Sequence, residues 1–131
     1  MRSLEQIDTS NLDQKRLAKA QEAATIIMSV LPAEMVVLFG SSAREIPRGN
    51  SDIDLAVFMR REDRVTSNEY DFLISSLQDN GFSVGLLSRM HREPERLHLT
   101  FTRSRETLEK ATDLFSMIVN DEGIVLSKGR S

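Results

Sequence analysis

Two short apolar segments stand close together in the chain and constrain the fold more than any other feature. The first runs from Met35 to Phe39 and ends at Gly40, and the second runs from Ile53 to Met59. Apart from Asp54, neither segment contains a polar residue, which is typical of strands buried on both faces. Such strands need helices to cover them, so the sequence predicts a sheet with helices packed on it.

The remaining apolar residues supply those covering elements. They recur at helical spacing in three segments, residues 11–31, 68–79 and 105–119. Ser10 or Asn11, and later Ser104, are the expected N-caps, and Pro32 ends the first helix. Further extended segments are expected at residues 82–87, 97–102 and 123–126. This order predicts an α/β (α+β) fold, a small mixed β-sheet of about four strands with helices packed on it, as a single domain over residues 1–131.

Composition narrows the class of protein. The chain has no cysteine, no apolar stretch of the roughly 20 residues that span a bilayer, and no signal peptide at its start, so we expect a cytoplasmic protein without a membrane anchor. A net charge of −3 disfavours a general nucleic-acid binder. The arginines from Arg89 to Arg105 can face an anionic partner, or form a solvated surface with nearby glutamates.

Two aspartates frame the start of the second apolar segment. Asp52 and Asp54 are two residues apart, so on a strand their carboxylates project from the same face. Two such carboxylates repel each other, and a divalent cation removes that conflict. An all-oxygen ligand set suits Mg²⁺, which also takes ligands from substrate phosphates.

The first apolar segment ends at Gly40-Ser41. Glycine lets the backbone bend and approach a ligand closely, and free N–H groups at a following helix start, with the Ser41 hydroxyl, can bind phosphate. The pair does not match the Walker motif and is also compatible with a plain turn.

Together these features form the stretch LFGSSAREIPRGNSDIDLAVF, which resembles the DNA polymerase β-like nucleotidyltransferase superfamily, and most closely its minimal nucleotidyltransferases. The resemblance implies a polymerase β palm-like fold. It implies that the loop binds the phosphates of a nucleoside triphosphate, and that the aspartates bind Mg²⁺ (or Mn²⁺) at the catalytic centre. The implied phosphate-binding residues are Gly40, Ser41, Ser42 and Arg44, and the implied catalytic and metal-binding residues are Asp52 and Asp54.

The resemblance also implies a reaction and partners. A nucleoside monophosphate, expected to be AMP from ATP, would pass to a hydroxyl group with release of pyrophosphate. Small members of this superfamily often act as the antitoxin beside a helical HEPN-domain protein, so a hydroxyl on such a partner is the expected acceptor. The apolar helices are also compatible with self-association, and the sequence does not decide between the two.

The chain departs from the family pattern at the third carboxylate, which a later strand normally supplies. Aligning Val84–Ser88 with that strand places Gly85 at the position, and aligning Arg96–Thr102 places His98 there. His98 can bind Mn²⁺, act as a base, or be a surface residue without a catalytic part. Glu45, where the family usually has glycine, adds negative charge near the loop. The alternative to an enzyme is therefore a catalytically impaired binding module that acts by binding nucleotide or a partner.

Overall fold

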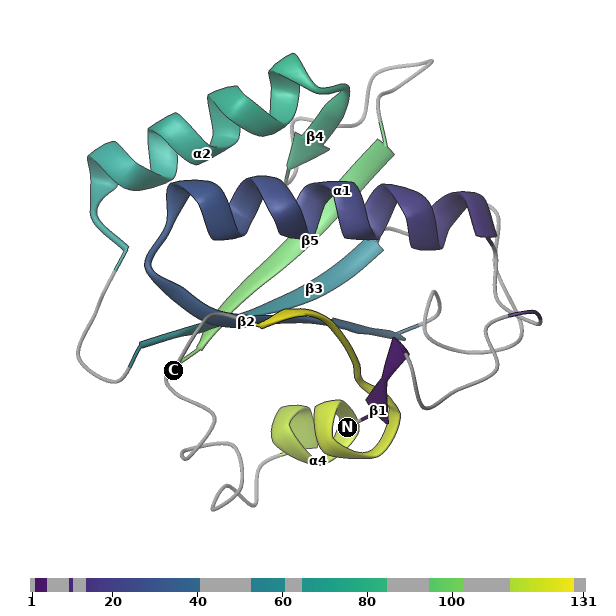
Figure 1. Ribbon diagram of the computed structural model, residues 1–131. Coiled ribbons are helices and arrows are strands. Elements are labelled where there is room, and N and C mark those ends of the chain that lie inside the picture. Colours follow the sequence, from purple (N-terminus) through teal and green to yellow (C-terminus); the bar gives the residue numbers. More distant parts are fainter. Residues whose placement is uncertain are drawn as a thin grey trace.

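A mixed β-sheet of six strands, with helices on both faces, forms the centre of the protein (Figure 1). The structure is a computed structural model, and it describes residues 2–4, 10, 14–40, 53–60, 65–84, 95–102 and 114–128. The helices are α1 (Gln14–Val30), α2 (Ser67–Asp79) and α4 (Leu114–Glu122). The strands are β1 (Arg2–Ser3), β2 (Ala33–Phe39), β3 (Ile53–Met59), β4 (Phe82–Val84), β5 (Glu95–Thr102) and β6 (Ile124–Lys128).

The order of the strands decides which residues become neighbours. Across the sheet the order is β1-β6-β2-β3-β5-β4. The central strand β3 pairs antiparallel with β2 and parallel with β5. A parallel pair needs a crossover connection, and α2 lies in the crossover from β3 to β5. β4 pairs with the outer side of β5 and is thus one strand removed from β3.

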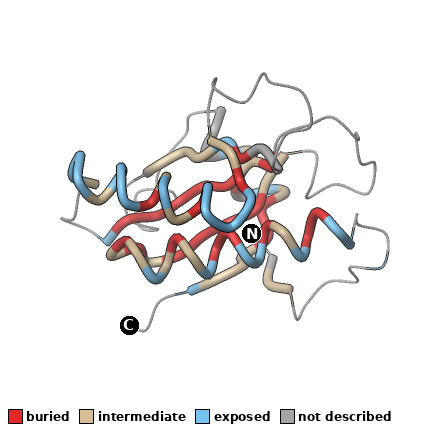
Figure 2. The backbone as a smooth tube through the Cα atoms, turned by 90° about the horizontal axis from the view of Figure 1, so that it is seen from above, coloured by how far each residue is buried: buried red, intermediate tan, exposed pale blue. Residues whose placement is uncertain are grey.

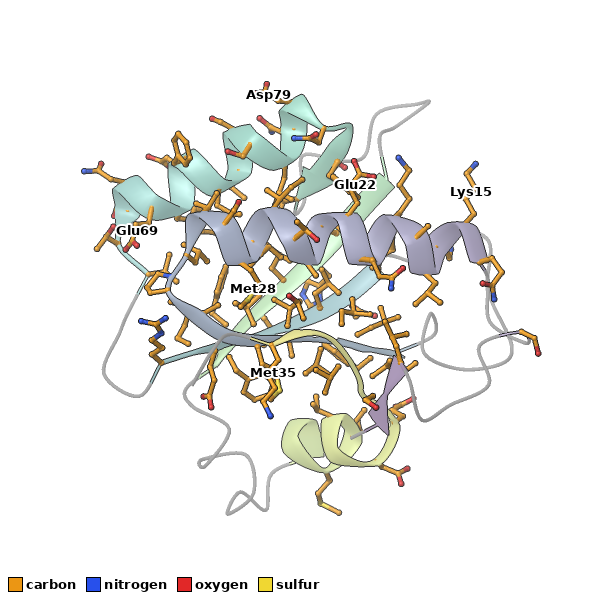
Figure 3. All side chains as sticks on the ribbon, viewed as in Figure 1. Lys15, Glu22, Met28, Met35, Glu69 and Asp79 are labelled. Atoms are coloured by element: carbon orange, nitrogen blue, oxygen red, sulfur yellow. The ribbon has the colours of Figure 1, made fainter. Side chains whose placement is uncertain are left out.

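The two central strands are buried on both faces, as their continuous apolar sequence predicts. Alternate residues such as Val36, Leu55 and Val57 belong to the large core cluster beneath α1 and α2. The residues between them belong to a smaller cluster on the opposite face, together with Val119 of α4. This second set is Met35, Val37, Ala56 and Phe58. Figure 3 shows Met28 and Met35 on opposite sides of the sheet, and Figure 2 shows the buried backbone concentrated in the central strands.

Most of the expected elements are confirmed, with shifted ends. The sheet is larger than expected because the segment at residues 123–126 is a full strand, β6, and because β1 pairs beside it. The last helix extends to Glu122, beyond its expected end, and the part expected over residues 105–113, with its cap at Ser104, lies outside the described residues. On α2, Tyr70 is 41% exposed, and its ring and that of Phe101 form a T-shaped pair with 6.1 Å between their centroids.

A capping box fixes the start of α2. The Thr66 hydroxyl accepts a hydrogen bond from the Glu69 backbone N–H at 3.2 Å, and Glu69 Oε1 accepts one from the Thr66 N–H at 3.1 Å. We expect Thr66→Ala to lower the free energy of unfolding by about 1 kcal/mol, since it removes the hydroxyl that accepts a hydrogen bond from the Glu69 backbone N–H. Chemical denaturation measures this change.

Thr25→Ala is the matched control. Thr25 is exposed in the middle of α1, and its hydroxyl donates to the Gln21 carbonyl at 3.0 Å within the same helix. Because alanine has the higher helix propensity, this substitution should leave stability unchanged or slightly increased. Equal destabilisation by both substitutions would contradict the assignment of a stabilising cap at Thr66.

None of the helices within the described ranges is long and apolar enough to cross a membrane.

Candidate functional site

Three adjacent strands bring one residue each to a common point. Gly40 directly follows β2, Asp54 is the second residue of β3, and His98 lies within β5. The antiparallel register places Phe39 opposite Asp54, and the parallel register places His98 opposite Asp54 on the other side. Asp54 is therefore the middle residue of the site, with Gly40 and His98 on either side of it.

Side chains alternate between the two faces of the sheet along β3, and this alternation decides which way Asp54 points. Its neighbours Ile53 and Leu55 are fully buried in the core beneath α1 and α2. Asp54 therefore belongs to the opposite face, which it shares with Ala56 and Phe58 of the smaller cluster. Its side chain is 27% exposed, so the carboxylate lies at the boundary between that apolar surface and solvent. This position lets the charged group stay hydrated while it is held by a rigid strand.

Gly40 is required for the conformation and for the space around Asp54. Its φ of +74° lies in the left-handed region that side chains rarely adopt. A Cβ atom built on Gly40 would lie 2.5 Å from Oδ2 and 3.3 Å from Cγ of Asp54. Any side chain at this position would therefore displace the carboxylate. The glycine leaves room for the carboxylate and for a ligand to approach the backbone.

His98 contacts the other carboxylate oxygen of Asp54. Its Nδ1 lies 3.1 Å from Asp54 Oδ1, and its side chain is 60% exposed. Because β3 and β5 are paired in parallel along their length, this contact is set by the backbone register as well as by the side chains. Both the imidazole and the carboxylate are accessible to an ion or ligand from solvent.

The structure resolves one question that the sequence left open. β5 is the direct neighbour of β3, and the residue opposite Asp54 on it is His98. β4, which begins the alternative strand, pairs only with the far side of β5. Of the two residues that the sequence offered for the third carboxylate position, His98 is thus the one placed opposite Asp54, and Gly85 lies outside the described residues. The other predicted site residues, Ser41, Ser42, Arg44 and Asp52, lie outside the described residues.

The donor atoms present can be compared with the metal that such a site implies. The Asp54 carboxylate suits an ion that also binds phosphate oxygens, so it fits the ion that accompanies a nucleoside triphosphate. A second Mg²⁺ ion, held by an all-oxygen set on the His98 side, does not fit the imidazole nitrogen found there. Within the described ranges, no third histidine or carboxylate joins the pair.

Solved structures with a similar fold were found at low sequence identity. A crystal structure of a putative nucleotidyltransferase from Sulfolobus solfataricus is 17% identical, with a TM-score of 0.50, over 88% of this chain and 82% of that one. A mutant toxin–antitoxin complex, MntA-HpeT, is 18% identical with a TM-score of 0.53, over 85% and 74% of the two chains. A toxin–antitoxin with AMP-PNP is 18% identical with a TM-score of 0.50, over 91% and 76%.

No curated protein sequence matches the chain. The family model described as "Polymerase beta, Nucleotidyltransferase" does match, over residues 21–114. That range includes the later part of α1, strand β2 with the Gly40 that follows it, strand β3 with Asp54, and strand β5 with His98. The chain belongs to the polymerase β nucleotidyltransferase family.

Proposed function

We propose that this protein binds ATP with a divalent cation and transfers AMP to a hydroxyl group of a helical, HEPN-type partner protein, for which it acts as an antitoxin. The observation that carries the proposal is that the Asp54 carboxylate lies against Gly40, where β2 ends and β3 begins, in a chain of this family. Asp52, two residues earlier in the sequence, is the proposed second carboxylate.

The nucleotide part of the proposal rests on two parts of this site, which are Gly40 with the residues that follow it, and the Asp54 carboxylate. Gly40 has no side chain, so the backbone and the following Ser41, Ser42 and Arg44 can approach the phosphates. Asp54 provides an oxygen ligand for the ion that accompanies them. The structural neighbour solved with AMP-PNP supports an adenine nucleotide as the donor.

The transfer step follows from the donor. The acceptor hydroxyl oxygen forms a new bond to the α-phosphorus of ATP, and the bond between the α- and β-phosphates breaks. Pyrophosphate leaves with that bonding electron pair, and the hydroxyl proton passes to solvent or to a nearby base. When bound, a divalent cation stabilises the negative charge that develops on these oxygens. The chain's own contribution is to hold the triphosphate in line with the acceptor.

The partner part of the proposal rests on the neighbours. Two of them are described as toxin–antitoxin structures, and in one the mutant carries glutamate in place of two aspartates that are two positions apart. That spacing equals the spacing of Asp52 and Asp54 in this chain. Both observations favour an antitoxin whose paired aspartates matter for its action.

A second candidate function is favoured by His98. Because the third carboxylate position holds a histidine, the chain can be a binding module that retains nucleotide or partner binding and lacks transfer. The first function predicts a covalent product, and the second predicts only a complex.

One experiment separates the two. The protein is incubated with ATP, Mg²⁺ or Mn²⁺, and the protein encoded by the adjacent gene, and intact-mass spectrometry is recorded on both chains. AMP transfer predicts a mass increase of one AMP on the partner, which is absent when Asp54→Asn replaces the wild type. Calorimetric binding of metal–ATP without any mass increase would overturn the enzyme and leave the binding module. If neither nucleotide nor metal binds, AMP transfer and nucleotide binding are both excluded, and only binding of the partner remains as a function.

A further inference from the structure

The contact between His98 and Asp54 places a nitrogen atom beside an oxygen atom in a site for which the sequence resemblance implies Mg²⁺ or Mn²⁺. We infer that His98 and Asp54 form a mixed nitrogen–oxygen ligand pair that selects a divalent transition-metal ion, with Mn²⁺ as the best fit, over Mg²⁺. The inference rests on the proposed function, because it names the metal of the same site.

The distance between the two donor atoms fits one ion bound by both. Asp54 Oδ1 and His98 Nδ1 are 3.1 Å apart. Adjacent ligands of an octahedral ion, each about 2.1 Å from the metal and at right angles, lie about 3.0 Å apart. Adjacent ligands of a tetrahedral zinc ion, at the same bond length, lie about 3.4 Å apart. The observed spacing is that of a hydrogen bond and is also close to that of two adjacent ligands of an octahedral ion, so an ion that replaces the shared proton needs little movement of either side chain.

Ligand type then separates the octahedral candidates. Mg²⁺ is a hard ion that binds oxygen and accepts imidazole poorly, whereas affinity for a site with nitrogen rises along the first transition series. Mn²⁺ combines the two requirements, since it binds carboxylate and phosphate oxygens and also tolerates a nitrogen ligand. An ion bridging Asp54, His98 and nucleotide phosphates meets both kinds of donor.

The surrounding sheet keeps the pair in place without depending on it. The residues next to His98 and Asp54 in their strands, Leu97 and Leu55, are fully buried in the main core and fix both strands. His98 itself is 60% exposed and contributes little apolar contact. Substitutions at position 98 should therefore change the metal site and leave the fold intact.

The direct test is whether the imidazole coordinates the ion. Pulsed electron paramagnetic resonance of the full-length protein with Mn²⁺ alone, and then with Mn²⁺ and AMP-PNP, detects the magnetic coupling of a coordinated nitrogen. Labelling histidine with nitrogen-15 assigns that coupling to imidazole. The chain has two histidines, so His91→Ala is the matched control for His98→Ala. We expect the coupling in the wild type and in His91→Ala, and its loss in His98→Ala.

Affinity provides the second measurement. We expect His98→Ala to weaken Mn²⁺ binding by at least about tenfold, since a metal ligand is lost, and to leave the weaker Mg²⁺ binding nearly unchanged. His98→Asp should reverse the preference by strengthening Mg²⁺ binding, because it returns the site to oxygen ligands. Circular dichroism of both variants confirms that the fold is retained.

The results distinguish this inference from the proposed function. A wild-type protein without imidazole coupling, or a His98→Ala variant that binds Mn²⁺ as tightly as wild type, overturns the ligand pair, whether or not AMP is transferred. Imidazole coupling with Mn²⁺ alone, in a protein that neither binds nor uses ATP, confirms the ligand pair and overturns the proposed function.

Discussion

In the Asp54→Asn variant, the proposed AMP transfer is expected to fall by about 100- to 1,000-fold, which corresponds to a loss of about 3–4 kcal/mol of transition-state stabilisation. Asparagine has nearly the same shape, so the strand pairing of β3 with β2 and β5 should persist. What changes is the negative charge at the one carboxylate that the structure places between Gly40 and His98. Transfer is measured as the rate of AMP incorporation into the partner protein.

Asp71→Asn is the control for this charge change. Asp71 is an exposed carboxylate on α2, away from the site, and its loss changes the net charge by the same amount. We expect it to keep the wild-type transfer rate and the wild-type increase in melting temperature on addition of metal–ATP. Asp54→Asn should lose that increase, because binding to the native state is what stabilises it. If Asp54→Asn retains both transfer and ligand stabilisation, Asp54 is not the metal-binding carboxylate.

Gly40→Ala is expected to lower transfer by about as much as Asp54→Asn, although it removes no functional group. The new Cβ would lie 2.5 Å from Asp54 Oδ2, a contact that forces the carboxylate to move. The φ of +74° adds a strain of about 1–2 kcal/mol to the folded state. We therefore expect lower stability together with loss of metal–ATP binding, measured by denaturation and by calorimetry.

Gly81→Ala separates these two effects. Gly81 follows α2 with a φ of +87°, and a Cβ there would meet no atom within 4 Å. It should therefore show the backbone strain of about 1–2 kcal/mol alone, with metal–ATP binding unchanged. If Gly40→Ala and Gly81→Ala have the same effect on ligand binding, the close approach of Gly40 to Asp54 has no role in the site.

Local sequence patterns predicted the elements and the central part of the site. The continuous apolar segments identified β2 and β3, and the bounds of β3 agree with the structure, because every residue of this buried strand except Asp54 is apolar. The position of Asp54 at the mouth of β3 followed from the same pattern. Helix starts and ends were less well predicted, as for α4, whose last residues, 120–122, are polar and lie beyond the apolar spacing that set the expected end at residue 119.

Strand order could not be predicted in the same way. Residues 82–87 and 97–102 both have the pattern of a strand, and nothing in either segment states which one lies next to β3. That choice is made by tertiary contacts, since β5 pairs with β3 on one side and β4 on the other. The identification of His98 as the residue opposite Asp54 depends on that order, so the sequence alone left it as one of two possibilities.

The parallel register between β3 and β5 has a consequence for how the protein can change over evolution. Leu97 is fully buried in the main core, whereas the side chain of its neighbour His98 lies on the opposite face of the sheet and is 60% exposed. A register shift of one residue would bury the histidine and expose the leucine. Packing of the core is therefore enough to fix the register of β5 against β3. Position 98 can then mutate among aspartate, histidine and other polar residues without loss of stability. If the inferred ligand pair is correct, a substitution at this one position changes the kind of metal ligand and leaves the core around it unaltered.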